Sequence, residues 1–169
     1  MILVRDLIQA ILYDLNETYN RKHSDEEFIH LINTVLRHIN VTLMNAESFY
    51  ILKEGKLKVR NGMAKLPDDF GKFHAFIDYD DDYKFMNHYV RLKEDTTMSY
   101  FFLIEEVEEI DDEIDLPYFF FDLIQRFVAG MISGLYTQDI LGQMVDQEVT
   151  KLTQSESAGP IDRPMPFYV

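Results

Sequence analysis

The chain of 169 residues contains no cysteine, so disulfide bonds and thiolate metal sites are excluded. This absence also fits assembly in a reducing compartment. Catalytic signatures are missing as well: the sequence has no GxSxG nucleophile elbow, no HExxH zinc motif, no Walker A loop and no GxGxxG loop. We therefore predict no catalytic residue, metal ligand or cofactor, and the chain is not expected to be an enzyme.

Basic residues are few and scattered. The chain has 16 Lys and Arg against 30 Asp and Glu, which gives a net charge of −14. A protein that reads nucleic-acid sequence needs clustered cations to displace phosphate counterions, so the charge argues against this class. Two interpretations of the acidic charge remain: simple solubility, or a surface past which a DNA duplex moves without sticking.

Long uninterrupted apolar runs are also lacking. The N-terminal stretch MILVRDLIQAILYDL has no cationic region and no small-residue cleavage site, so it is not expected to be a signal peptide. The most apolar stretch, Leu116 to Tyr136, contains Asp122, Gln125 and Arg126 in its middle. A bilayer would tolerate these poorly, so the stretch predicts a buried helix and no membrane association.

The chain does have enough apolar material for one sizeable core, because 47% of its residues are hydrophobic and 13 are Phe. Apolar periodicity predicts helices at about 2–20, 25–46, 116–135 and 137–153, around a β region at about 49–104. The expected fold class is α+β: helical hairpins with a small antiparallel β insertion. Residues 1–153 are expected to form one domain, followed by an extended C-terminal arm, 154–169.

The first two helices have the clearest signals. The second follows a capping-box pattern, in which Ser24 and Glu27 can each bond the other's backbone N–H. A short polar turn between two amphipathic helices predicts an antiparallel hairpin. The apolar stripe of the first helix consists of Leu3, Leu7, Ile8, Ile11, Leu12 and Leu15.

Turn signals divide the middle of the chain into short aromatic and β-branched runs, beginning with Phe49–Leu52. The signals are Glu54-Gly55, Asn61-Gly62, Pro67-Asp68-Asp69 and Asp80-Asp81-Asp82. The pattern predicts a small antiparallel sheet or meander. After it, Asp115 is expected to cap the third helix, with Pro117 in its first turn.

An acidic segment, Glu105 to Asp115, joins the β region to the third helix. Its candidate site residues are Glu105, Glu106, Glu108, Glu109, Asp111, Asp112 and Glu113. The segment is either a solvent-facing connector, whose charge favours the N-terminus of the next helix, or the acidic wall of a channel or a contact for a basic partner.

Two further groups have the composition of a metal site but not its spacing. The run Asp78 to Asp82 lacks the glycine and the glutamate of a calcium loop, because Tyr83 and Tyr89 stand there. It is expected to be an acidic turn. His30 and His38 lie about two helical turns apart with no carboxylate between them on that face, which favours a solvated or interfacial pair.

The C-terminal arm combines stiff prolines with bulky apolar residues. Such a segment is typical of a peptide that docks in a groove of another protein, and the alternative is a frayed terminus. The predicted residues that contact a portal protein or a neighbouring subunit are Pro160, Ile161, Arg163, Pro164, Met165, Pro166, Phe167, Tyr168 and Val169.

The order of these features resembles that of the head-to-tail connector (adaptor) proteins of tailed bacteriophages. The resemblance rests on VRDLIQAILYDL, on SDEEFIHLINTVLRHIN, on Leu66-Pro67-Asp68-Asp69-Phe70, and on Leu116-Pro117 before the C-terminal helices. The β region is larger and more aromatic than in the smallest adaptors, and the C-terminal helix has less alanine. Such a chain would suit a ring protein of a short-tailed phage of the crAss-like kind.

The resemblance implies a virion structural protein that forms a dodecameric ring between portal and tail. The implied partners are further copies of the chain, the portal protein and other tail or ring proteins, with genomic DNA passing through without sequence-specific binding. Such a protein assembles in the host bacterial cytoplasm and resides at the portal–tail junction of the virion. The alternatives are a small acidic regulatory protein that binds a cytosolic partner, and a metal-dependent enzyme that uses Asp78 to Asp82.

Overall fold

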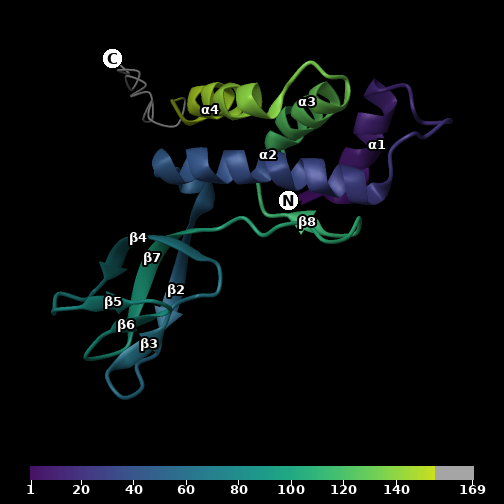
Figure 1. Cartoon of the computed structure of the whole chain (residues 1–169). Helices are drawn as coiled ribbons and strands as arrows, with labels where there is room; N and C mark the ends of the chain where they lie inside the picture. Colours follow the sequence, from purple (N-terminus) through teal and green to yellow (C-terminus); the bar gives the residue numbers. More distant parts are fainter. Residues whose placement is uncertain (155–169) are drawn as a thin grey trace, which may run out of the picture.

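The protein has an α+β fold, seen in a computed structural model that describes residues 1–154. Within these residues, four helices pack into a body, and six strands form a β lobe that projects from one end of it (Figure 1). The helices are α1 (Val4–Asp14), α2 (Asp25–Asn45), α3 (Phe120–Ile132) and α4 (Gln138–Gln154).

Helix α2 is the centre of the helical body, because both α3 and α4 pack against it. The predicted capping box is confirmed at its first turn. The Ser24 hydroxyl accepts from the Glu27 N–H (3.3 Å), and the Glu27 carboxylate accepts from the Ser24 N–H (2.7 Å). The buried apolar side chains of α2 are Phe28, Ile32, Val35, Leu36, Ile39 and Leu43.

Helix α1 is shorter than the predicted range 2–20. Its first residues instead form strand β1 (Ile2–Leu3), which pairs antiparallel with β8 (Glu113–Ile114). At the other end, the helix stops before Asn16, whose φ of 56° is left-handed. Apolar periodicity does not register a two-residue ribbon or a single left-handed residue, so the predicted helix was too long at both ends.

Helix α3 begins at Phe120, later than the predicted range 116–135, and its first-turn cap also differs from the prediction. The residue at the cap is Phe119, which makes no side-chain hydrogen bond there. The prediction that Asp115 caps this helix is wrong. Its carboxylate lies 2.9 Å from the Lys53 ammonium in the β lobe, so Asp115 forms an ion pair there and does not cap α3.

The β lobe consists of two three-stranded antiparallel sheets. In one, the order β2-β7-β4 joins Leu52–Leu57, Thr96–Phe102 and Phe70–Ile77. In the other, the order β3-β6-β5 joins Met63–Lys65, Tyr89–Arg91 and Lys84–Met86. Aromatic rings fill the space between the sheets: the ring centroids of Phe73 and Phe85 lie 5.1 Å apart, and those of Phe76 and Tyr83 lie 4.9 Å apart.

Two of the turn signals have opposite outcomes. Asn61 and Gly62 form the predicted tight turn, with φ of 53° and 76°, and both backbone hydrogen bonds between Arg60 and Met63 are made. Glu54-Gly55 lies inside β2 instead. There a Cβ on Gly55 would come within 3.2 Å of the Tyr100 ring, so the glycine serves close packing. The first aromatic run, predicted extended, is a 3-10 helix at Phe49–Ile51.

The turn between α3 and α4 depends on a glycine in the last part of α3. A Cβ on Gly130 would lie 2.2 Å from the Tyr136 ring, which itself packs on Phe127 at 5.4 Å between centroids. Gly130→Ala is therefore expected to displace Tyr136 and to lower the free energy of unfolding in urea by about 1 kcal/mol or more.

The control for this prediction is the same substitution in a Tyr136→Ala background. Without the ring, Gly130→Ala is expected to stabilise the protein by roughly 0.5–1 kcal/mol, because alanine is the better helix former. A destabilisation of equal size in both backgrounds would contradict the proposed packing conflict.

Candidate functional site

The acidic segment is held against α2 by a polar stripe on that helix. The buried Asn33 side chain donates to the Val107 carbonyl and accepts from the Val107 N–H, both at 2.8 Å. Two helical turns further along α2, the side-chain oxygen of Asn40 accepts a hydrogen bond from the Ile104 N–H at 3.3 Å. An extended segment outside a sheet needs partners for its backbone groups, and these asparagines provide them.

Between the two asparagines, Arg37 binds Glu106. Its guanidinium reaches both carboxylate oxygens, at 2.7 and 3.2 Å. The hydrogen bond from Arg37, together with its charge, lowers the pKa of Glu106. Both side chains are exposed, so the pair mainly fixes the position of the segment on α2 and contributes little stability.

The far end of the segment folds around Asp112. Its carboxylate accepts from the backbone N–H groups of Glu108 (2.8 Å) and Glu109 (2.9 Å), which lowers the pKa of Asp112. Its carbonyl accepts from the N–H of Val4 at 3.1 Å. The β1–β8 pairing then fastens the segment to the start of α1.

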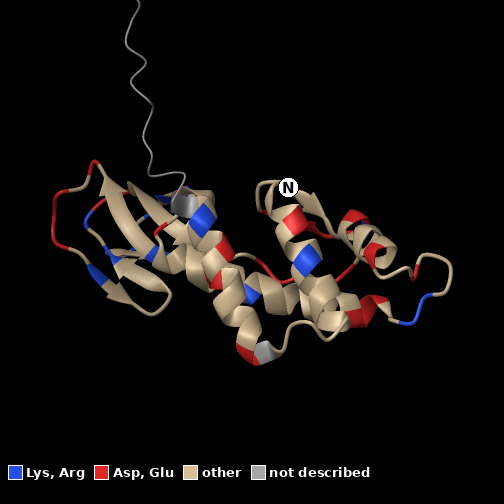
Figure 2. Cartoon of the chain, turned by 90° about the horizontal axis from the view of Figure 1, so that it is seen from above, with Lys and Arg blue, Asp and Glu red and all other residues tan. Residues whose placement is uncertain are grey.

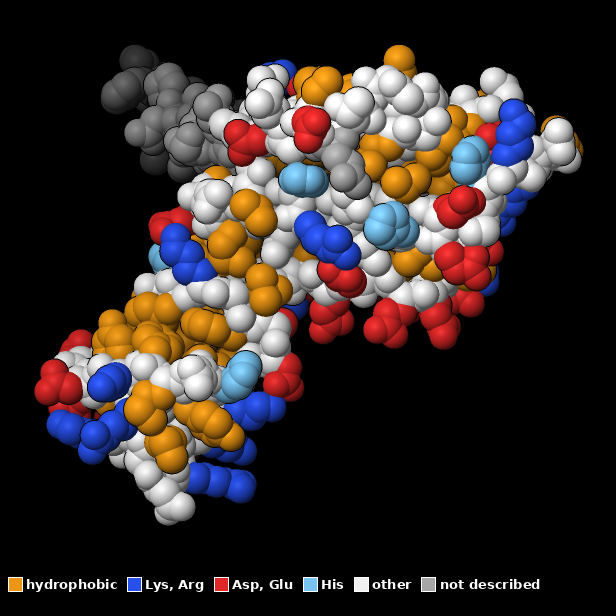
Figure 3. Space-filling model, in the orientation of Figure 1, with side chains coloured by type: hydrophobic (Ala, Val, Ile, Leu, Met, Phe, Trp, Pro, Cys, Tyr) orange, Lys and Arg blue, Asp and Glu red, His pale blue; other side chains and the backbone are white. Residues whose placement is uncertain are grey.

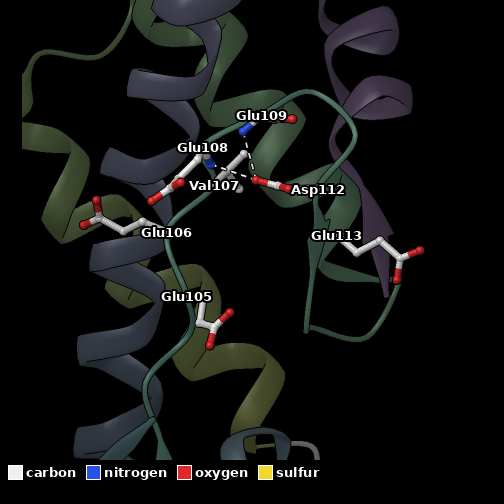
Figure 4. A pocket seen from close by; sticks show the side chains of 7 residues that line it. All are labelled: Glu105, Glu106, Val107, Glu108, Glu109, Asp112 and Glu113. Carbon is white, nitrogen blue, oxygen red and sulfur yellow. Dashed lines mark hydrogen bonds between the residues drawn. The ribbon is translucent and has the colours of Figure 1, made fainter. Parts of the chain in front are cut away.

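These contacts leave an acidic hollow of about 650 Å³, shown in Figure 4. Of the seven predicted acidic residues, Asp111 does not line it, because its carboxylate pairs with Arg5 of α1. The carboxylates project along the lower edge of the helical body (Figure 3). The lining residues are Glu105, Glu106, Val107, Glu108, Glu109, Asp112 and Glu113.

Four carboxylates of the hollow make no ion pair with any residue among 1–154: Glu105, Glu108, Glu109 and Glu113. The hollow contains no histidine, lysine, serine or cysteine that could serve as a nucleophile or a proton donor. Within the described residues, no three His, Asp or Glu side chains are close enough together to hold a metal ion. What the arrangement provides is a fixed patch of negative charge.

A second set of contacts joins the acidic segment to the β lobe. Lys53 of β2 lies 2.9 Å from Asp115 and 3.4 Å from Asp69, and 3.9 Å from the centre of the Phe102 ring. Partial burial acts to lower the pKa of Lys53, but the two carboxylates outweigh it and raise that pKa. Burial, with the 2.9 Å hydrogen bond from the Tyr100 hydroxyl to Asp69, raises the pKa of Tyr100 to about 12. The Lys53–Asp115 ion pair thus joins the lobe to the acidic segment, and Asp69 of the Leu-Pro-Asp-Asp-Phe element binds Lys53 and Tyr100 within the lobe.

The remaining predicted groups lie apart from the hollow. His30 borders a shallow groove near the start of α2, whereas the His38 ring packs against Gly142 of α4. In the acidic turn, Asp81 pairs with Lys93 at 2.7 Å. The predicted partner-binding residues of the arm, Pro160 to Val169, lie outside the described residues.

The distribution of charge between the two parts of the fold was not foreseen from the sequence. The β lobe, residues 49–102, holds nine Lys and Arg and nine Asp and Glu, and therefore has no net charge. The rest of the described chain, 1–48 and 103–154, holds six basic and 19 acidic residues, a net charge of −13. Figure 2 shows this segregation, with most of the blue segments in the lobe.

No protein-family model matches the chain, and no curated protein sequence matches it either. No helix among residues 1–154 is both long enough and apolar enough to cross a bilayer. The function must therefore be argued from the geometry of the hollow and from the distribution of charge.

We predict that Asn33 contributes more stability than Asn40, although both bind the backbone of the acidic segment. Asn33→Ala leaves the buried Val107 N–H and carbonyl without partners and should cost about 2–3 kcal/mol of unfolding free energy in urea. Asn40→Ala removes one longer bond and should cost about 1 kcal/mol or less. Equal losses of stability in the two variants would show that the two hydrogen bonds between Asn33 and Val107 do not anchor the segment.

The bonds to Asp112 predict a local acid transition. The pKa of Asp112 is lowered in the folded state, so its hydrogen bonds stabilise the fold fully above the unfolded pKa of about 3.9. This stabilisation is lost as pH falls through the folded pKa. In an NMR acid titration, the amide shifts of Glu108 and Glu109 should change with a midpoint below about 3.9. In Asp112→Asn this transition should be absent, and a midpoint at or above the unfolded value would contradict the assignment.

Proposed function

We propose that this protein is a virion structural protein that forms a ring at the portal–tail junction of a tailed phage and surrounds the DNA conduit. The observation that carries the proposal is the row of unpaired carboxylates fixed along one edge of the helical body. The order of sequence features shared with head-to-tail adaptors supports it independently.

A fixed acidic edge suits a surface past which DNA moves. Duplex DNA carries one negative charge per about 1.7 Å of its axis, so a wall of carboxylates repels it and offers no phosphate a cation to bind. The contacts of Asn33, Arg37 and Asn40 hold the carboxylates in place on α2. In a ring this edge would recur in every copy and form a continuous negative lining.

The two-lobed shape gives each copy two different surfaces for its neighbours. An interface between unlike surfaces is repeated from copy to copy and closes into a ring when the rotation allows it. A stable contact of this kind buries roughly 1,200–2,000 Å² in total. The proposed partners are therefore further copies, the portal protein, and adjoining ring or tail proteins. Free monomer would persist until the portal provides a template.

The proposal predicts that the purified protein forms a ring complex with the portal of the same phage, seen by mass photometry and negative-stain microscopy. The conduit role is tested with Glu105→Gln/Glu113→Gln, which removes two unpaired carboxylates of the acidic edge without changing side-chain size. Rings should still form, but virions that carry the variant should eject DNA more slowly.

The matched control removes two exposed carboxylates of the β lobe, Glu54→Gln/Glu94→Gln, and should eject normally. Equal ejection rates in the two variants would refute the conduit role. A protein that stays monomeric with the portal and never enters particles would refute the ring and favour the regulatory alternative.

A further inference from the structure

The outer face of the sheet β3-β6-β5 is an unusual surface for so acidic a protein. In the register of this sheet, Met63, Arg91 and Lys84 lie in one row across the three strands, and Lys65, Tyr89 and Met86 lie in another. All six side chains are exposed. The row between them, Ala64, Val90 and Phe85, points to the interior, because successive side chains of a strand face opposite sides.

This outer face is cationic. Arg91 and Lys84 lie directly opposite each other on neighbouring strands, and neither makes an ion pair within the described part of the chain. Like charges in such a pair destabilise a sheet, so the fold places them together at a cost. Of the cations in the two rows, Lys65 alone is paired, with Asp68 at 2.6 Å.

The same face is also apolar. Met63, Met86 and Tyr89 are each 40–47% exposed. Beside them opens a cavity of about 720 Å³ whose lining includes Phe70 and Leu103. Methionine, tyrosine and arginine are enriched at protein interfaces, whereas lysine-rich solvated faces carry few such anchors.

The chemistry required of a partner is an acidic surface of fixed shape, and the chain itself provides one. The acidic hollow holds four unpaired carboxylates, and the whole excess of negative charge in the described residues lies in the helical body that bears it. Nucleic acid also presents negative charge, but a chain of net charge −14 would repel it at long range.

We propose that the outer face of β3-β6-β5 docks onto the acidic hollow of a second copy of this chain at Glu108 and Glu109, and leaves Glu105 and Glu113 exposed to the conduit. This contact rests on the proposed ring and names the surfaces that join its subunits. The two surfaces lie on different parts of the molecule, the far sheet of the β lobe and the edge of the helical body (Figures 1 and 3). Each copy therefore has one of each to offer, which is the requirement for a repeated head-to-tail contact.

Two charge-reversed variants test the contact. Lys84→Glu/Arg91→Glu makes the sheet face acidic and leaves a like-charge pair in the sheet, so its effect on folding should be small. Glu108→Lys/Glu109→Lys replaces the two carboxylates of the proposed contact with cations. The controls reverse the same number of charges elsewhere: Lys22→Glu/Lys151→Glu for the first variant, and Asp139→Lys/Asp146→Lys for the second.

Self-association is measured by sedimentation velocity at low ionic strength, and ring formation by mass photometry with the portal. Each test variant alone should associate about tenfold or more weakly than the unmodified protein, because it opposes like charges across the contact. The two test variants mixed together should recover association, since each then meets an oppositely charged partner at both surfaces. The controls should associate normally, alone and mixed.

Carbodiimide cross-linking of a mixture of light and ¹⁵N-labelled protein provides a second measurement. A mixed-isotope cross-link between Lys84 and Glu108 or Glu109 is the expected product. Rings that form equally well from each test variant alone, without such cross-links, would overturn the contact and leave the ring standing.

Two further outcomes would also overturn the proposed contact. Failure of the unmodified protein to form any oligomer, even with the portal, would remove the ring as well. Fluorescence anisotropy that shows duplex DNA binding to the unmodified monomer, abolished by Lys84→Glu/Arg91→Glu, would assign the sheet face to nucleic acid.

Discussion

The arrangement of this protein depends on the polar stripe of α2. Residues 103–112 lie between β7 and β8 and belong to no sheet, so their backbone groups need other partners, and burial without them is costly. Asn33 satisfies both groups of Val107, and Asn40 binds Ile104. Because the same helix carries the apolar core of the body on its other faces, the acidic segment is fixed relative to that core. Without these hydrogen bonds the carboxylates would have no defined positions, and the acidic hollow would not form.

The fixed segment in turn determines how the β lobe is joined to the body. The chain passes from α2 through the 3-10 helix Phe49–Ile51 into β2, and it leaves the lobe through β7, shortly before the acidic segment. Lys53 of β2 bridges the two paths, because its ammonium binds Asp115 at the end of the acidic segment. The lobe is thus attached by two chain crossings and one partly buried cation. Because the lobe is held in place, the neutral lobe and the acidic body lie in fixed positions relative to each other.

The sequence predicted those parts of the fold that depend on local patterns. The Ser24–Glu27 capping box, the Asn61-Gly62 turn and the apolar face of α2 each involve residues within one or two turns of each other. The acidic residues of the site were likewise visible as composition, and six of the seven line one hollow. The features that the sequence did not reveal depend on residues far apart in the chain. Ile2 pairs with Ile114 in a short ribbon, and Asp115 binds Lys53 instead of capping α3. The cationic sheet face was missed because its strands have three residues each, too few to show a period of two.

The segregation of charge also limits how copies of the chain can meet. A symmetric dimer through the helical bodies would bring together two bodies that each have a net charge of −13. One through the outer sheet faces would place the Lys84 and Arg91 of one copy opposite those of the other. Both isologous arrangements are repulsive, and like-charge juxtaposition at an interface costs several kcal/mol. A lobe-to-body contact is the attractive combination of the two surfaces, and it joins unlike surfaces. Electrostatics therefore disfavours both like-to-like contacts and favours the lobe-to-body contact, which continues from copy to copy unless a two-fold rotation closes it.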